Sequence, residues 1–303
     1  MSKIIRTLFI TILTILVWGG SLIGGTILGR HLIGSAADEN AAAKYSADII
    51  TYLIVLLALF LLIMVFKANN ILKNLKTFRS SVSRWAFLAL FLCIAGDLLL
   101  NTKYVLFIME NGYLDYQQLK FSGPFTLLLA MLVYVAVGLT EEVCCRGILL
   151  LIWQKFFQKH KHTKMKAALI SSILFGAVHL INLANGFTVS NIIYTFSQIF
   201  FAAMYGMFFA AIMIKTKSLW FCALSHGMID LAANITYLFV PMKIMDSIPD
   251  AVLIGYSSLE SIISFLAIIP GFIWAIHTVY VADKTVTEKD YEAYLTGKEK
   301  SRA

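Results

Sequence analysis

Charged residues are scarce in this 303-residue chain, and their scarcity excludes a soluble globular domain. Only 14% of the residues are charged, whereas 59% are hydrophobic and the mean hydropathy is +0.80. A soluble fold cannot bury that much apolar surface, so the composition predicts a protein that crosses a lipid bilayer several times. The net charge of +8 therefore does not indicate nucleic-acid binding. In a membrane protein it matters instead on which side Lys and Arg gather.

Cysteine and proline are also few, and the common motifs of soluble enzymes are missing. The four cysteines lie in apolar runs, without the spacing of a metal site or a disulfide framework. Three of the four prolines, Pro124, Pro241 and Pro249, stand at expected helix ends, and Pro270 lies within the last expected helix. The chain has no His-Glu-x-x-His pair, no Gly-x-Ser-x-Gly elbow and no Gly-rich phosphate loop.

What the chain does contain is a series of long apolar runs, which predict an all-α polytopic membrane protein with about eight transmembrane helices. We expect three helices with their loops in residues 1–124, a core in 125–282 and a charged cytoplasmic tail in 283–303. The predicted helices are 7–29, 46–66, 85–101, 125–153, 167–185, 190–214, 218–240 and 259–282.

The positive charges test this helix count. If the eight helices alternate in direction, 19 of the 25 Lys and Arg residues fall on one side and five on the other, with Arg146 in the membrane. Positive loops stay in the cytoplasm, so both termini are predicted to be cytoplasmic. We expect a multi-pass protein of the cell membrane, and specifically of a bacterial plasma membrane.

The most unusual stretch is Gly138 to Leu150, where Glu141, Glu142 and Arg146 interrupt an apolar run. A charge near the bilayer centre costs ~2.5–3.5 kcal/mol on insertion scales, so these groups need partners or a function. Glu142 and Arg146 are four residues apart and can pair on one helix face. Glu141 points about 100° away and has no such neighbour. It is either a spare group beside a structural ion pair or a candidate for chemistry.

Two further helices bring ionisable groups to the same depth. Glu142 lies 13 residues before Lys155, His179 lies 13 after Lys166, and Asp230 lies 13 after Lys217, with His226 on the same helix. At 1.5 Å per residue these groups are ~14–20 Å from the cytoplasmic end, near the middle of the bilayer. Asp97 reaches a similar level, and for it we expect pairing or a hydrogen bond between helices rather than catalysis.

Such a set of groups is suited to activating water. A carboxylate among apolar side chains can act as base and then as acid, and a neutral imidazole can share the water proton. A histidine supported by an acid can donate to the oxyanion of a tetrahedral intermediate. The same groups are also of the types that bind zinc, so this alternative stays open.

The ordered motifs resemble the CPBP family of CaaX-protease and bacteriocin-processing intramembrane endopeptidases, also called Abi or type II CaaX prenyl endopeptidase-like proteins. They are Glu141-Glu142-x-x-x-Arg146, Phe175-x-x-x-His179 and His226-x-x-x-Asp230, within about residues 125–240. The resemblance implies hydrolysis of a peptide bond at a membrane-buried site that opens to the cytoplasm. It implies that Glu141 with His179 activates water, that Glu142 and Arg146 organise the site, and that His226 and Asp230 bind the oxyanion or orient the substrate.

Family members have been described both as metalloproteases and as metal-free glutamic proteases. The lack of a His pair on one helix favours a site that requires no cofactor, with zinc as the alternative. The expected partners are the lipid bilayer and a membrane-associated peptide or protein: a prenylated C-terminus, a leader peptide or a membrane-protein segment. Two other functions remain open, a non-catalytic scaffold or bacteriocin-immunity-type protein and a proton-coupled transporter. Against transport, the two halves of the chain show no repeat.

Overall fold

The computed structural model describes residues 2–66, 71, 83–158 and 160–284, and these residues are almost entirely helical. Part of the predicted 67–84 loop and the tail beyond residue 284 lie outside the described residues. The elements are α1 (Lys3–Ile33), α2 (Ala36–Glu39), α3 (Ala41–Val65), α5 (Arg84–Glu110), η1 (Tyr116–Gln118), α6 (Pro124–Glu142), η2 (Val143–Leu149), α7 (Leu150–Phe157), α8 (Thr163–Ala177), η3 (Val178–Asn185), α9 (Val189–Thr216), α10 (Leu219–Ala233), η4 (Ile235–Leu238), α11 (Met242–Ser247) and α12 (Asp250–Lys284).

The all-α polytopic membrane fold predicted from the sequence is confirmed. Seven spans in the described residues are long and apolar enough to cross a membrane, and they correspond to seven of the eight predicted helices. The eighth, predicted over 218–240, is shorter: α10 ends at Ala233 and a 3₁₀ turn follows. Pro124 begins α6 and Pro249 directly precedes α12, where a missing backbone N–H does no harm.

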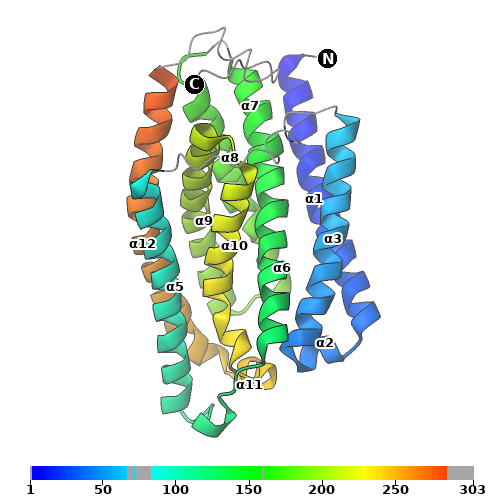
Figure 1. Cartoon of the computed structure of the whole chain (residues 1–303), viewed down its shortest axis with the longest axis vertical. Helices are drawn as coiled ribbons and strands as arrows, with labels where there is room; N and C mark the ends of the chain where they lie inside the picture. Colours follow the sequence, from blue (N-terminus) through cyan, green and yellow to red (C-terminus); the bar gives the residue numbers. More distant parts are fainter. Residues whose placement is uncertain (1, 67–70, 72–82, 159, 285–303) are drawn as a thin grey trace.

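The helices form a bundle in which the segment from α6 to α10 occupies the centre (Figure 1). Helices α1 and α3 pack together at one side, α5 and α12 lie at the other, and α6, α8, α9 and α10 lie between them. The most apolar window of α9 is 61% buried within the protein, against 22% for α1. Helix α9 is therefore the central element, while α1 leaves most of its apolar surface for lipid.

Small residues allow the central helices to approach closely. Gly227 of α10 faces the backbone of α6, where an added Cβ would lie 2.5 Å from the carbonyl oxygen of Tyr134. Gly206 of α9 faces α8, where a Cβ would lie 2.9 Å from Cα of Ser172. Such contacts are typical of helices that pack in lipid, where close van der Waals contact replaces the hydrophobic effect as the driving force. They hold α10 close to α6 and α9 close to α8.

The two ends of the described chain lie at the same end of the bundle. The Lys3 side chain donates to the carbonyl oxygen of Phe156, at the end of α7. The Asp283 carboxylate, at the end of α12, accepts from the backbone N–H groups of Lys164 and Met165 and so caps the start of α8. Figure 1 shows the start of α1 and the end of α12 at this end. A chain that crosses a membrane an even number of times, as the eight predicted helices would, has both ends on the same side.

The orientation of that end in the membrane is a testable prediction. Because positive residues gather there, reporter fusions after residue 40 and at the C-terminus should report opposite sides of the membrane, with the C-terminus in the cytoplasm. Alkaline phosphatase and fluorescent-protein fusions measure the two sides independently. Two fusions on one side would contradict the eight-crossing arrangement.

Candidate active site

The Glu-Glu-x-x-x-Arg motif lies where α6 changes into a π-helical segment. Glu141 and Glu142 are the last residues of α6, and Arg146 lies in η2. The backbone N–H of Leu150 bonds to the carbonyl oxygen of Cys145, a π-type spacing of five residues. A π segment locally widens the helix and often occurs at functional sites. The sequence predicted one continuous helix over 125–153, because no residue pattern announces such a change.

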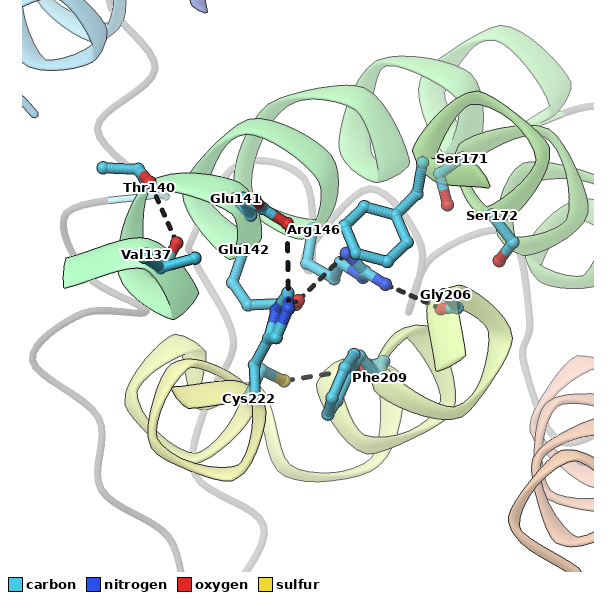
Figure 2. A network of polar contacts seen from close by, with 12 residues as sticks. Val137, Thr140, Glu141, Glu142, Arg146, Ser171, Ser172, Gly206, Phe209 and Cys222 are labelled. Atoms are coloured by element: carbon cyan, nitrogen blue, oxygen red, sulfur yellow. Dashed lines mark hydrogen bonds and ion pairs between the residues drawn. The ribbon is translucent and has the colours of Figure 1, made fainter. Parts of the chain in front are cut away.

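Arg146 and Glu142 form a fully buried ion pair. Neither side chain has solvent-exposed area, and Nη1 of Arg146 lies 3.0 Å from Oε1 of Glu142. Nη2 donates to the carbonyl oxygen of Gly206 on α9 at 3.0 Å (Figure 2). The guanidinium also lies over the ring of Phe175, 4.5 Å from its centroid. One side chain therefore links the π segment to α8 and α9.

His226 of α10 lies between Glu142, which is paired with Arg146, and Glu141. Its Nδ1 is 2.9 Å from Oε1 of Glu142, and since this oxygen also faces Arg146, the ring nitrogen is the donor. Its Nε2 lies 3.7 Å from Oε2 of Glu141 and 3.5 Å from Oδ2 of Asp230. The ring stacks on Phe209, with centroids 5.1 Å apart. Nδ1 is thus used to hold the ring, while Nε2 faces the two remaining carboxyl groups.

The helix that carries His179 changes from α to 3₁₀ geometry close to the site. The predicted helix 167–185 is α-helical only to Ala177, and η3, which contains His179, is a 3₁₀ segment. Nδ1 of His179 lies 2.9 Å from the carbonyl oxygen of Phe175, which can only accept, so Nδ1 carries a proton. In the neutral ring Nε2 is then the acceptor. Farther along η3, Asn182 donates to Gln198 of α9 at 2.7 Å.

A cavity of about 130 Å³ lies beside the two histidines. His179, His226 and Asp230 line it, as do Asp97 of α5 and Glu260 of α12. Glu141 is not part of this lining, although 16% of its side chain is accessible beside His226. Within the described part of the chain, the ionic contact of Glu141 is to His226, and none joins it to His179.

The predicted residues are therefore brought together in two groups. Glu141, Glu142, Arg146, His226 and Asp230 form one continuous set of polar contacts. His179 joins through the cavity and through Phe175, whose ring meets both histidines edge-on. Sequence reasoning missed Glu260 and Gln198. The predicted helix 259–282 puts Glu260 at its start, whereas α12 begins at Asp250 and places Glu260 well inside the helix.

The side chains do not fit a zinc site in this arrangement. Zinc requires three or four protein ligands converging within ~2.0–2.3 Å of one point. Among the described residues, no three His, Cys, Asp or Glu side chains are grouped in a way that holds a metal ion. Glu142 already contacts Arg146 and His226, and Nδ1 of His179 is already hydrogen-bonded to the carbonyl oxygen of Phe175. The geometry gives no support to a metalloprotease site.

The structure thus places glutamate and histidine side chains beside a cavity inside an all-α membrane bundle. The family described as type II CAAX prenyl endopeptidase Rce1-like matches residues 123–232, which include all six candidate residues. This confirms the resemblance seen in the motifs. At the level of the family it supports a CAAX-type intramembrane protease with a membrane-associated substrate. Neither the curated proteins nor the solved structures gave a match.

The buried ion pair generates a stability prediction. Arg146→Ala should lower the yield of folded protein, because Glu142 loses its cation at depth, a penalty of about 3–5 kcal/mol. Detergent-solubilised protein eluting as a single species, together with its Tm, measures this loss. The matched control is Arg84→Ala, which removes an exposed arginine at the start of α5 and should leave both values nearly unchanged. Equal behaviour of the two variants would show that the pair does not support the fold.

Proposed function

We propose that this protein is an intramembrane endopeptidase that hydrolyses a peptide bond of a membrane-associated substrate with water activated by Glu141. The observation that carries the proposal is the contact set of Glu141, His226 and Asp230 beside a cavity, within the segment that matches the endopeptidase family. Ionisable groups placed at this depth are costly, and a functional site is the usual reason for keeping them.

Glu141 is the proposed general base and acid. Its carboxylate takes a proton from water as the water oxygen attacks the scissile carbonyl carbon, which forms a tetrahedral oxyanion. The same proton then passes to the leaving amine as the C–N bond breaks, so that an acid and an amine are released. His179 has Nε2 available to accept the second hydrogen bond of the attacking water, since Nδ1 donates to Phe175.

His226 is the proposed oxyanion donor. Because Nδ1 already donates to Glu142, this role requires the doubly protonated ring, with Nε2–H directed at the oxyanion. Nε2 lies 3.7 Å from Glu141, so a reacting carbonyl can stand next to both base and donor. Asp230, at 3.5 Å from the same nitrogen, favours the charged ring. Glu142 and Arg146 are positioning residues in this scheme, because Glu142 holds His226, Arg146 holds Glu142, and neither touches a reacting atom.

The substrate class follows from the place of the site and from the family. A prenylated C-terminal peptide, a leader peptide or a membrane-protein segment can each reach a buried site from the cytoplasmic side. We place the protein in a bacterial plasma membrane, with the positively charged bundle end in the cytoplasm.

The base assignment predicts that Glu141→Gln lowers cleavage by about 10²–10⁴-fold, the usual contribution of a general base, while the protein still accumulates and inserts. Quantitative mass spectrometry of membranes carrying this variant should reveal peptides that remain uncleaved. Glu110→Gln, which removes an exposed carboxyl group at the end of α5, is the control. If both variants and the wild type give identical membrane peptides, the protein is a non-catalytic scaffold.

The metal requirement is a separate prediction. We expect cleavage to continue after treatment with a membrane-permeant chelator, because a glutamate base needs only hydrogen-bond reach to water. Elemental analysis of the same purified sample should find less than one zinc per chain. Stoichiometric zinc, with activity lost on stripping and restored by zinc alone, would contradict the metal-free mechanism.

A further inference from the structure

The cavity beside the proposed catalytic groups has an acidic wall that the reaction does not use. Asp97 comes from α5 and Glu260 from α12, two helices outside the family-matched segment. They line the same cavity as Asp230 of α10. Three carboxyl groups from three helices therefore meet at one cavity.

Asp97 lacks a partner that its burial demands. Its residue surface is only 6% exposed, and its Oδ2 atom has no hydrogen-bond partner in the described structure. The neighbouring Asn101 donates to the backbone carbonyl of Asp97 and to that of Ala232, so its amide does not donate to the carboxyl group of Asp97. A buried acceptor without a donor lowers the stability of the fold, and does so more strongly if it is charged. An unsatisfied carboxyl group on a cavity wall is positioned to receive a donor from a ligand.

The rest of the lining suits a cation. The charged ring of His226 faces Asp230, and besides the two histidines the described lining residues include no basic side chain, so no lysine or arginine of the lining neutralises Asp97 and Glu260. Tyr194, Phe201 and Tyr205 add aromatic rings to the walls. Carboxylates combined with aromatic faces are the usual surroundings of a bound ammonium or guanidinium group.

We propose that this cavity binds a lysine or arginine side chain of the substrate, adjacent to the bond that is cleaved. The inference rests on the proposed peptidase function and narrows its substrate class. With Asp97 of α5 and Glu260 of α12 in the cavity wall, a basic residue in the cavity anchors the substrate chain while the neighbouring peptide bond lies at His226 and Glu141. Asp97 and Glu260 are specificity residues, with no role in proton transfer.

The competing explanation is that the acids are protonated and hydrogen-bond to water or to each other. In that case the cavity shows no preference for positive charge, whereas a cation site discriminates between a guanidinium and a neutral group of the same shape. Octylguanidinium and octylurea form such a pair, since their head groups are similarly planar and only the first is charged.

The binding test uses purified full-length protein in nanodiscs of zwitterionic lipid, with empty nanodiscs to correct for partitioning. By calorimetry, octylguanidinium should bind about ten- to a hundredfold more tightly than octylurea, the value of one or two charge-assisted hydrogen bonds. Asp97→Asn with Glu260→Gln should abolish the preference, and Glu260→Gln alone should reduce it if the double variant is poorly folded. Glu110→Gln should retain it. Equal binding of the two probes to the wild type would overturn the proposal.

A cleavage test separates this inference from the proposed function. Lys or Arg should occur near the cleavage site of peptides that accumulate in Glu141→Gln membranes. Replacing that residue by Gln should raise KM at least tenfold for the wild type but not for the Asp97→Asn, Glu260→Gln variant. Charge-selective binding without any cleavage would keep the cation site and remove the peptidase function. Cleavage that does not depend on a basic residue would keep the peptidase function and remove the cation site.

Discussion

The arrangement of this site depends on one interaction, the ion pair between Arg146 and Glu142 in the apolar interior. Both side chains are fully buried, so each is tolerable only because the other is present. The pair also has outside contacts: Arg146 reaches the backbone of Gly206, and Glu142 holds Nδ1 of His226. Through these contacts a charge pair within one segment sets the positions of α9 and α10.

The irregular segments of the chain are found where the polar groups gather. The motif arginine lies in a π segment, His179 in a 3₁₀ segment, and a 3₁₀ turn follows α10. Backbone that departs from α-helical geometry at membrane depth is tolerated where protein or a cavity covers it; here the π segment is buried and His179 lines the cavity. The departures from α geometry also turn side chains in directions that a regular helix would not give them. The site is built from these departures as much as from the motif residues.

The functions that we propose divide between two parts of the bundle. Helices α6 to α10 match the endopeptidase family and carry the six residues proposed for water activation and oxyanion binding. Helices α5 and α12 lie outside the match and contribute the acidic cavity wall. Such a division suits a peptidase in which a conventional set of catalytic groups is combined with a separate surface for recognising the substrate.

The sequence by itself determined the fold class, the main spans and the candidate residues of the site. Apolar runs are visible in the sequence, and an ionisable residue within such a run stands out because it is costly in a bilayer. The ionisable residues of this kind at the site are Glu141, Glu142, Arg146, His179, His226 and Asp230. Only the tertiary structure decided how these groups are paired: Glu142 holds His226, Glu141 faces it, and Glu260 is brought to Asp97. These pairings depend on helix rotation, on the π segment and on the true start of α12. Those features arise from packing between helices, which no local pattern in the chain encodes.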